Sequence, residues 1–239
     1  MRVVGGDWRG RKLEEPRDWD VTRPTADRVR EACASMFDAN LPHGIEGVSA
    51  LDAFAGSGAM GVELLSRGAR HVLFYDIDRA AASLVRRNVE LVGCSRSRYR
   101  VTCGDVLLAA ERGLMDGAPF DAVFIDPPYA LGAEPAEELL GSLLSRDLLA
   151  PGAVVLFERS TAATPPLRVE GLTPLREKRY GGTTVDLLVL EGGGGVGAAG
   201  RVDASAPGGE VSAEPSSGGV PTGSADGWEA PAPEDGAGA

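Results

Sequence analysis

The sequence predicts an α/β domain with a doubly wound, mostly parallel β-sheet, and three observations support this fold class. From residue 48 to residue 158, short apolar segments alternate with amphipathic helical segments, which is typical of parallel strands joined by right-handed crossovers. Glycine or acidic residues follow several predicted strands, where a ligand site of this fold class would lie. Only Gly181-Gly182 separates the last two strands, so they must be antiparallel and form a mixed edge of the sheet.

The individual elements follow from hydrophobic periodicity and from the residues that begin and end each segment. A helix is expected over residues 25–40, because its apolar residues recur at steps of three and four. Further helices are expected at 60–67, at 78–92 with Asp78 as its N-cap, at 106–112 and at 135–144. Strands are expected at 48–52, 71–75, 99–103, 120–125 and 154–158, with a closing hairpin at 172–179 and 183–190.

The two ends of the chain differ in composition from this domain. Residues 1–24 form a basic N-terminal arm, which is either a short β-hairpin or an irregular segment, followed by a polar connection. Residues 191–239 hold 14 glycines, 5 prolines and a single aromatic residue, Trp228. Such a segment buries too little apolar surface to offset its ordering entropy, so we expect a disordered acidic tail. The chain thus divides into an arm (1–24), a folded domain (25–190) and a tail (191–239).

Charge is distributed unevenly along the chain. The tail carries −7 of the total net charge of −11, so the remaining residues carry only −4. Two clusters are basic: the segment from Arg2 to Lys12 has four basic residues and one acid, and the segment from Arg86 to Arg100 has five arginines and one glutamate. Local clusters decide nucleic-acid binding, so the acidic total does not exclude it. Either cluster alone is also typical of a solvated surface.

Cysteine usage and the N-terminus indicate the compartment. The three cysteines are odd in number and widely spaced, with no CxxC pair, which is typical of a reducing environment. The N-terminus lacks the apolar run of a signal peptide. No segment approaches the ~20 apolar residues of a membrane span. We therefore expect a cytoplasmic protein without a membrane partner.

The loop after the first strand of the alternating region is a candidate cofactor site. Residues 52–61 read DAFAGSGAMG and satisfy the spacing G-x-G-x-x-G, in which glycine lets the backbone approach a ligand beside a helix N-terminus. By spacing alone this is a weak signal, because a tight turn without function gives the same pattern. The cofactor-binding candidates in this loop are Asp52, Phe54, Gly56 and Gly58.

Residues after two later strands extend this candidate site. Asp76, twenty residues past Gly56, can accept hydrogen bonds from two ribose hydroxyls, and Ile77 beside it is a further candidate contact. Asp105 ends a later strand and can hold an adenine amino group. NAD and S-adenosylmethionine both present a ribose diol and an adenine. Three such features in order favour an adenosine-containing cofactor over a purely structural turn.

The motif Asp126-Pro127-Pro128-Tyr129 decides between these cofactors. It follows the apolar segment 120–125 and so lies at the carboxyl end of a central strand, where the reactive end of the cofactor should lie. The prolines hold the backbone rigid, so Asp126 and a neighbouring carbonyl can accept both hydrogens of a planar amino group while Tyr129 stacks on a base. Accepting these hydrogens orients the nitrogen and stabilises the charge developing during methylation. We therefore predict Asp126, Pro127 and Tyr129 as catalytic residues; a capping turn without function is the alternative.

Together these motifs resemble a known family. The motifs FAGSG, YDID, CGD and DPPY, preceded by the segments 2–13 and 23–31, closely resemble RsmD-type 16S ribosomal RNA guanine-N2 methyltransferases over roughly residues 1–190. The resemblance implies a Rossmann-like class I methyltransferase fold with a seven-stranded sheet. It also implies S-adenosylmethionine as donor and a guanine of 16S rRNA as acceptor, in a small ribosomal subunit or its assembly intermediate.

The resemblance further implies roles for individual residues. Gly56, Gly58 and Asp76 would lie at the cofactor, and Asp126 and Tyr129 would lie at the target base. We expect a monomer that needs no metal ion.

Other activities share parts of this pattern. DPPY alone also fits DNA amino-methyltransferases acting on adenine N6 or cytosine N4, but these usually carry a separate target-recognition domain, for which the folded residues leave no room. A glutamine-N5 protein methyltransferase should have Asn before the two prolines. A non-catalytic RNA-binding module with a vestigial fold is the alternative from another class. The intact Asp126 and glycine loop count against it.

An acidic protein that binds RNA needs a local basic surface. The target base must leave its stack to reach Asp126, so the flanking backbone has to be held. The Gly-rich arm is a poor place for core residues and a good one for phosphate contacts, and it is distant in sequence from the glycine loop. The predicted RNA contacts are Arg9, Arg11, Lys12, Arg23 and Arg30. The last two could instead form salt bridges with Asp27 or Glu31, and residues 86–100 are the alternative RNA surface.

Overall fold

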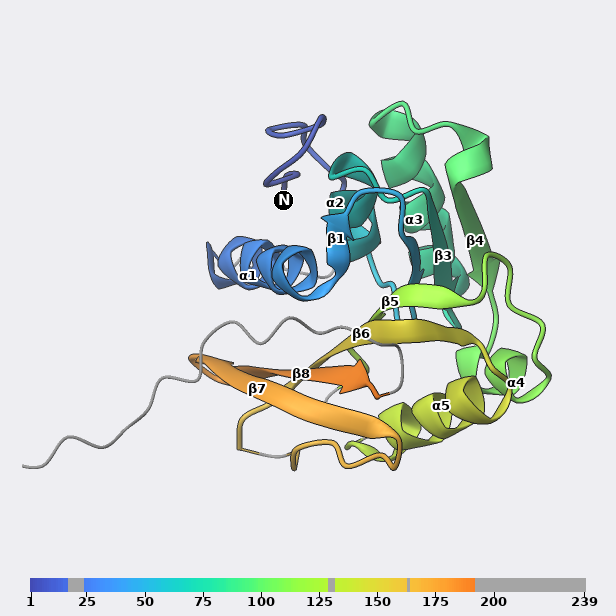
Figure 1. Ribbon diagram of the computed structural model, residues 1–239. Coiled ribbons are helices and arrows are strands. Elements are labelled where there is room, and N and C mark those ends of the chain that lie inside the picture. Colours follow the sequence, from blue (N-terminus) through green and yellow to red (C-terminus); the bar gives the residue numbers. More distant parts are fainter. Residues whose placement is uncertain (17–23, 129–131, 163, 192–239) are drawn as a thin grey trace, which may run out of the picture. The chain divides into compact units, whose positions relative to one another are not determined.

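The computed structural model describes residues 1–16, 24–128, 132–162 and 164–191. Its helices are α1 (Pro24–Asn40), α2 (Ala59–Ser66), α3 (Arg79–Leu91), α4 (Val106–Glu111) and α5 (Glu134–Ser145), with a short 3-10 helix η1 (Arg96–Arg98). Its strands are β1 (Pro42–Ile45), β2 (Ser49–Asp52), β3 (His71–Asp76), β4 (Tyr99–Cys103), β5 (Phe120–Ile125), β6 (Leu149–Ser160), β7 (Leu172–Tyr180) and β8 (Thr183–Leu190). Figure 1 shows these elements.

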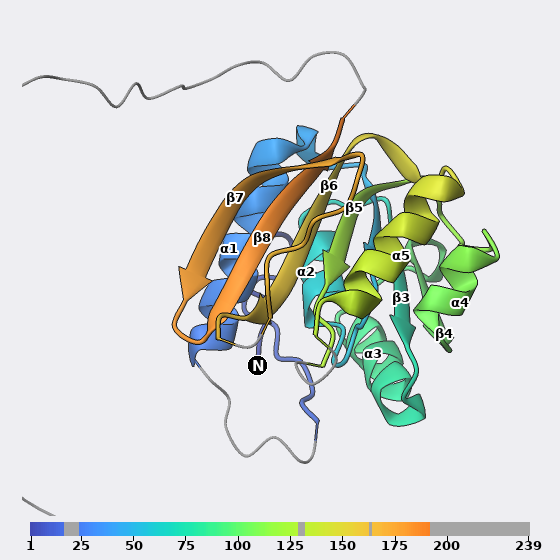
Figure 2. The same cartoon turned by 90° about the horizontal axis from the view of Figure 1, so that it is seen from below.

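Seven of the strands form one sheet in the order β4-β3-β2-β5-β6-β8-β7. The pairs from β4 to β6 are parallel, whereas β8 is antiparallel to both β6 and β7. Figure 2 shows the row of strands from β7 through β8, β6 and β5. This topology confirms the predicted doubly wound sheet with an antiparallel edge hairpin, and the reversal of strand order next to β2 is where ligands bind in such sheets.

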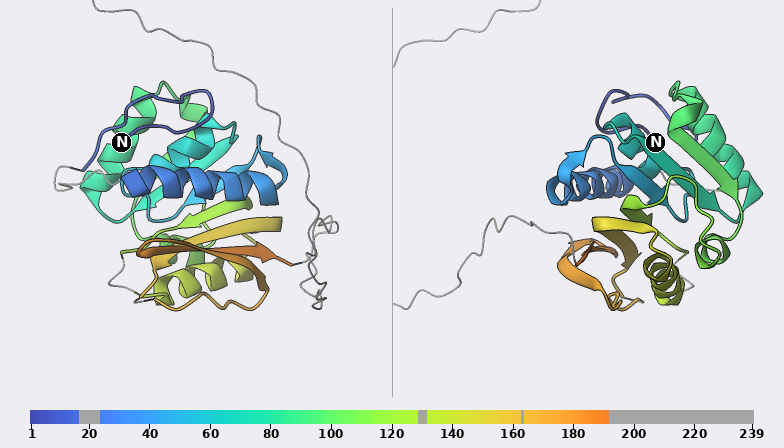
Figure 3. Two further views of the ribbon diagram at one scale, coloured as in Figure 1. Left: turned by 90° about the vertical axis from the view of Figure 1, so that its left-hand side faces the viewer. Right: turned by 45° about the vertical axis from the view of Figure 1, so that its right-hand side comes forward.

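Helices cover both faces of the sheet, as Figure 3 shows. Alternate side chains of each strand point to opposite faces. One core cluster joins α1, α2 and α3 to side chains such as Ala50, Phe74, Phe124 and Leu156. The other joins α4 and α5 to their neighbours in the strands, such as Leu51, Val123 and Phe157. The face on which a residue at the end of a strand lies therefore follows from the face of the residue two positions before it.

The structure differs from the sequence expectations in three elements. β1 forms at Pro42–Ile45, where proline and glycine predicted only the end of a helix, and it lies outside the main sheet. η1 was not expected either. β6 is twelve residues long rather than five, because pairing of Leu149 with Phe120 extends it across Pro151 and Gly152. Tertiary pairing overrides local turn propensity in this strand.

Several predictions lie outside the described residues. These concern Tyr129, Arg23, most of the polar connection that precedes α1, and the tail from residue 192 onward. Among the residues that the structure describes, no helix is both long enough and apolar enough to cross a membrane.

Candidate active site

The carboxyl ends of four neighbouring strands bring acidic residues to one edge of the sheet, namely Asp52, Asp76, Asp126 and Glu158. Each follows, by two residues, a side chain of the core beneath α1, α2 and α3, in order Ala50, Phe74, Phe124 and Leu156. Because side chains two residues apart in a strand share a face, all four carboxylates belong to that face. The four acidic groups therefore lie together at the carboxyl ends of β3, β2, β5 and β6.

The glycine loop between β2 and α2 is held by one of these carboxylates. Asp52 Oδ2 accepts a hydrogen bond from the Gly61 amide at 2.9 Å. A Cβ on Gly61 would lie 2.1 Å from the Phe74 ring, and one on Gly58, whose φ is +74°, would lie 2.9 Å from Val85. A Cβ on Gly56 would meet no atom within 4 Å. Gly58 and Gly61 therefore serve helix packing, whereas the backbone at Gly56 faces open space that a ligand could fill.

Asp76 ties the glycine loop to the turn after β3. Its Oδ2 accepts from the Gly56 amide at 2.8 Å, and its Oδ1 accepts from the Asp78 amide at 2.9 Å. Each oxygen retains a second lone pair for a further donor. Asp78 caps α3 by accepting from the Ala80 amide at 2.7 Å, which confirms its predicted role as N-cap. Asp76 is thus oriented by the backbone at the end of β3.

The other predicted cofactor contacts differ in their surroundings. Ile77 is 75% exposed, an unusual position for a large apolar side chain, and it directly follows Asp76. Asp105 caps α4 through hydrogen bonds from the amides of Leu107 and Leu108 to its Oδ1. Phe54 packs against the core beneath α4 and α5. Ile77 is therefore available to a ligand, Asp105 has a structural use as a cap, and Phe54 belongs in part to the core.

The electrostatics of this edge favour protonated carboxyls. Burial raises the pKa of Asp126 to about 7. Burial also raises the pKa of Glu158 to about 8, with a further contribution from the charge of Asp126. Burial raises the pKa of Asp52 to about 8 as well, although the Gly61 amide opposes this shift and Asp126 and Asp76 add to it. Like charges in a poorly solvated site cannot all be ionised at neutral pH.

Glu158 is a residue of this site that sequence reasoning missed. Its position carries the same signal as Asp126, because it is an acid at the carboxyl end of the apolar segment 153–157. The neighbouring Arg159 points to the other face, where it bonds to Asp186 and Glu177 and to the Thr164 carbonyl. The acid at the end of β6 could have been identified by treating every strand end alike.

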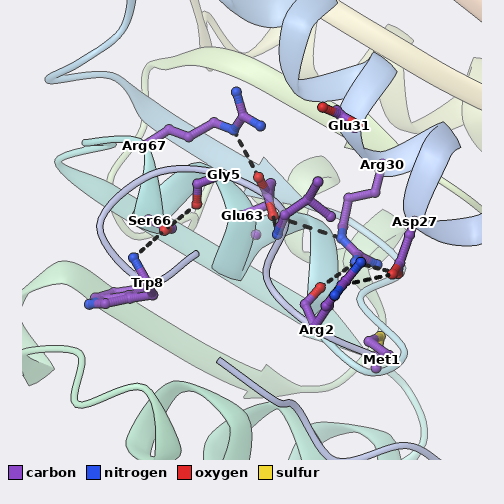
Figure 4. Close-up of polar contacts among 12 residues, drawn as sticks. Met1, Arg2, Gly5, Trp8, Asp27, Arg30, Glu31, Glu63, Ser66 and Arg67 are labelled. Atoms are coloured by element: carbon purple, nitrogen blue, oxygen red, sulfur yellow. Dashed lines mark hydrogen bonds and ion pairs between the residues drawn. The ribbon is translucent and has the colours of Figure 1, made fainter. Parts of the chain in front are cut away.

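The N-terminal arm is docked onto α2 (Figure 4). Glu63, which is fully buried, accepts hydrogen bonds from the Val4 amide and from Arg67, each at 2.8 Å. Ser66 Oγ accepts from the Trp8 amide at 2.9 Å and donates to the Gly5 carbonyl at 2.7 Å. A buried charge requires such partners, so Glu63 fixes the arm in one position on the domain.

One expectation about the arm is wrong. Val3 and Leu13 are buried in the core, so the arm does supply core residues. The arm is distant from the glycine loop in sequence, but α3 links the two segments in space, because the Asn88 amide group donates to the carbonyls of both Glu14 and Ser57.

Arg30 is a structural residue rather than a free phosphate contact. It is only 7% exposed, bonds to the Arg2 carbonyl, and pairs with Asp27 at 2.7 Å. Its Nε lies 3.9 Å from Glu63. These contacts favour the alternative salt bridge with Asp27, and Arg30 joins α1 to both the arm and α2.

The two basic clusters of the sequence meet on one surface. Arg9, Arg11 and Lys12 are exposed on the arm, and Arg11 donates to the Val92 carbonyl at 2.7 Å at the end of α3. Trp8 lies under the Arg98 guanidinium, 5.8 Å from ring centre to carbon. Residues of α3, η1 and β4 line a hollow of about 300 Å³, namely Arg86, Glu90, Arg96, Tyr99, Arg100 and Val101. The arm and residues 86–100 are therefore neighbours rather than alternatives.

Comparison with known proteins identifies the family. A family model described as "Conserved hypothetical protein 95" matches residues 1–189. The chain belongs to this family. The ribosomal RNA small subunit methyltransferase D of Haemophilus influenzae is 34% identical over 181 residues, which are 76% of this chain and 89% of that protein.

Solved structures agree with this family assignment. One from Haemophilus influenzae, described as a methylase, has 31% identity and a TM-score of 0.65, covering 80% of this chain and 98% of that chain. The rRNA methyltransferase aviRa of Streptomyces viridochromogenes, at 20% identity and a TM-score of 0.54 over 74% of this chain and 88% of that chain, shares the fold alone. The fold is therefore the predicted Rossmann-like class I methyltransferase fold, and the family match includes the arm.

Proposed function

We propose that this protein transfers a methyl group from S-adenosylmethionine to the exocyclic N2 of a guanine in 16S rRNA. The observation that carries the proposal is Asp126-Pro127-Pro128 at the carboxyl end of β5, on the same edge and face of the sheet as Asp76 and the open space at Gly56. The family match and the 34% identity to a ribosomal RNA small subunit methyltransferase support small-subunit rRNA as the substrate class.

The residues at the edge of the sheet fit this cofactor. Asp76 has lone pairs for two ribose hydroxyls, Gly56 leaves room for the backbone to approach, and exposed Ile77 offers an apolar surface to adenine. Asp105 remains the proposed partner of the adenine amino group. When bound, S-adenosylmethionine supplies a methyl group activated by a positively charged sulfur.

Asp126 is the proposed catalytic residue. Its carboxylate accepts a hydrogen bond from the target amino group, and the rigid Pro127 holds it at the end of β5; Tyr129 is proposed to stack on the base. As the guanine nitrogen gains the methyl group it becomes positively charged and must release one proton. A preorganised carboxylate stabilises this developing charge.

The proposed RNA surface begins on the arm. Arg9, Arg11 and Lys12 expose their charges on a segment that Glu63 and Ser66 hold in place. The hollow lined by Arg86, Arg96 and Arg100 is a second basic feature of the proposed surface. Phosphate contacts fix the register of RNA without reading sequence, so this surface would hold the backbone while the base enters the site. Arg23 stays a predicted contact.

Transfer of a labelled methyl group from S-adenosylmethionine tests the proposed acceptor. 16S rRNA, small ribosomal subunits and duplex DNA are offered separately. We expect label in the RNA of at least one ribosomal substrate and none in DNA. Label in DNA would support the amino-methyltransferase of DNA instead, and cofactor binding without transfer to any acceptor would support a non-catalytic RNA-binding module.

Replacing Arg9, Arg11 and Lys12 together by alanine should weaken RNA binding and flatten its salt dependence. Each lost phosphate contact lowers the slope of log K against log salt by about 0.7–0.9. Affinity for 16S rRNA is measured across a salt series. The Kd for S-adenosylmethionine should not change, because none of these three side chains is among the proposed cofactor contacts, although the arm itself lies near the glycine loop.

A matched control removes the same charge from another surface. Arg112, Arg146 and Arg168 are exposed and lie in or next to α4 and α5 or in the segment before β7. Their triple replacement by alanine should leave the salt slope close to that of the unmodified protein. Equal effects of the two triple variants would refute a specific role of the arm.

A further inference from the structure

Asp126 and Glu158 form a pair across two parallel strands. The register of β5 and β6 places Ala122 beside Val154 and Phe124 beside Leu156. Asp126 and Glu158 are the next two residues on the same face. Neighbouring strands lie about 4.8 Å apart, so the two carboxyl groups are side by side at the edge of the sheet where the target base is proposed to bind.

The charged and titratable groups around this pair are few among the described residues. From α1, the fully buried Cys33 interacts with both carboxyls: burial, and then the charges of Glu158 and Asp126, raise the pKa of its thiol well above the usual value, while Arg30 lowers it. Along the sheet, Asp52 on β2 interacts with Asp126. On the other side of Glu158 lies Val185 of β8, and Lys178 of β7 lies beyond it.

We propose that Glu158 is a positioning residue that shares one proton with Asp126 and thereby keeps Asp126 ionised for the target amino group. This inference rests on the proposed function. Two adjacent carboxyls in a poorly solvated site titrate as a unit, with one proton retained over a wide pH range. If Glu158 holds that proton, Asp126 accepts a hydrogen bond from the amino group as a carboxylate.

The pair also has a place for the proton that the reaction releases. The new nitrogen–carbon bond leaves the guanine nitrogen with a positive charge, and loss of one N–H proton to the Asp126 carboxylate restores neutrality. The pair then holds two protons and returns one to water before the next turnover. No oxidant, reductant or metal is required for this balance.

The pH dependence of single-turnover methyl transfer tests the pairing. Two variants of Glu158 separate the loss of its hydrogen-bond donor from the loss of its ionisable proton. Glu158→Gln keeps a neutral donor beside Asp126 and should leave the acid limb of the rate profile near its original position, whereas Glu158→Ala removes the donor and should move the acid limb to higher pH by about one unit. An acid limb that stays in its original position in Glu158→Ala would overturn the proposal. If the unmodified protein transfers no methyl group to RNA, the proposed function itself fails, which is a different result.

Thermal stability gives a readout that does not depend on catalysis. A carboxyl with a raised folded-state pKa destabilises the fold as the pH rises above its unfolded value of about 4. The change in Tm caused by Glu158→Gln should therefore be more positive at pH 8 than at pH 4. The same is expected of Asp126→Asn. Because removing one charge already relieves the other, the double variant should gain less than the sum of the two.

Glu170→Gln is the matched control, because Glu170 is exposed outside this site. It should shift neither the acid limb nor the Tm difference between the two pH values. Additive gains in the double variant at pH 8 would contradict a coupled pair, even if Glu158→Gln folds normally and transfers methyl groups.

Discussion

Asp126→Ala is expected to lower the turnover number for rRNA methylation about 10²–10³-fold, the usual cost of removing one preorganised contact to a developing charge. The Kd for S-adenosylmethionine should change little, because Asp76 and the glycine loop, rather than Asp126, are the proposed cofactor contacts. Single-turnover rates at saturating cofactor and calorimetric titration measure the two effects separately.

An electrostatic argument separates this loss of turnover from a loss of folding. Burial raises the pKa of Asp126 to about 7, so between pH ~4 and pH 7 the carboxyl ionises in the unfolded chain but not in the folded one, and the folded state loses stability as the pH rises. Asp126→Ala removes this electrostatic destabilisation. The loss of the Asp126 charge should therefore not lower the Tm at pH 8. Glu111→Ala, on the exposed end of α4, is the control. Turnover of Asp126→Ala close to that of the control would mean that Asp126 has no catalytic role.

Asp76→Ala should weaken binding of S-adenosylmethionine by about 1.5–3 kcal/mol, because the ribose hydroxyls lose a charge-assisted partner. This corresponds to roughly a 10- to 150-fold increase in Kd. The substitution also releases the amides of Gly56 and Asp78, which the carboxylate holds at 2.8 and 2.9 Å. Calorimetric titration with the cofactor measures the change.

Asp78→Ala separates cofactor binding from local stability. Asp78 caps α3, so its removal should cost about 1 kcal/mol of stability with little change in Kd. If Asp76→Ala binds the cofactor normally while Asp78→Ala does not, the ribose contact belongs to Asp78.

The fold and most of the site edge could be predicted because their signals are local. Strand–helix alternation and the Gly-Gly turn predicted the sheet topology. The positions of Asp52, Asp76 and Asp126 at the ends of predicted strands indicated the edge at which they lie. The N-cap at Asp78 was likewise readable from its position before a helical pattern. Each of these features depends on neighbours within a few residues.

Contacts between distant segments could not be predicted in the same way. The arm docks on Glu63 and Ser66, about sixty residues away in the sequence, and no periodicity in the sequence reports this. The burial of Arg30 against Asp27 and the arm, which argues against a phosphate contact, depends on tertiary packing. The proposed pairing of Asp126 with Glu158 could be inferred only from the register of β5 and β6, which the sequence does not report.

The identity of the methylated nucleoside tests the central claim most directly. 16S rRNA from a strain lacking this protein is digested to nucleosides and analysed by mass spectrometry, before and after incubation with the protein and S-adenosylmethionine. The account predicts that N2-methylguanosine is reduced in the deletion strain and restored by the protein. An unchanged N2-methylguanosine content, or a methyl group restored on a different nucleoside, would contradict it.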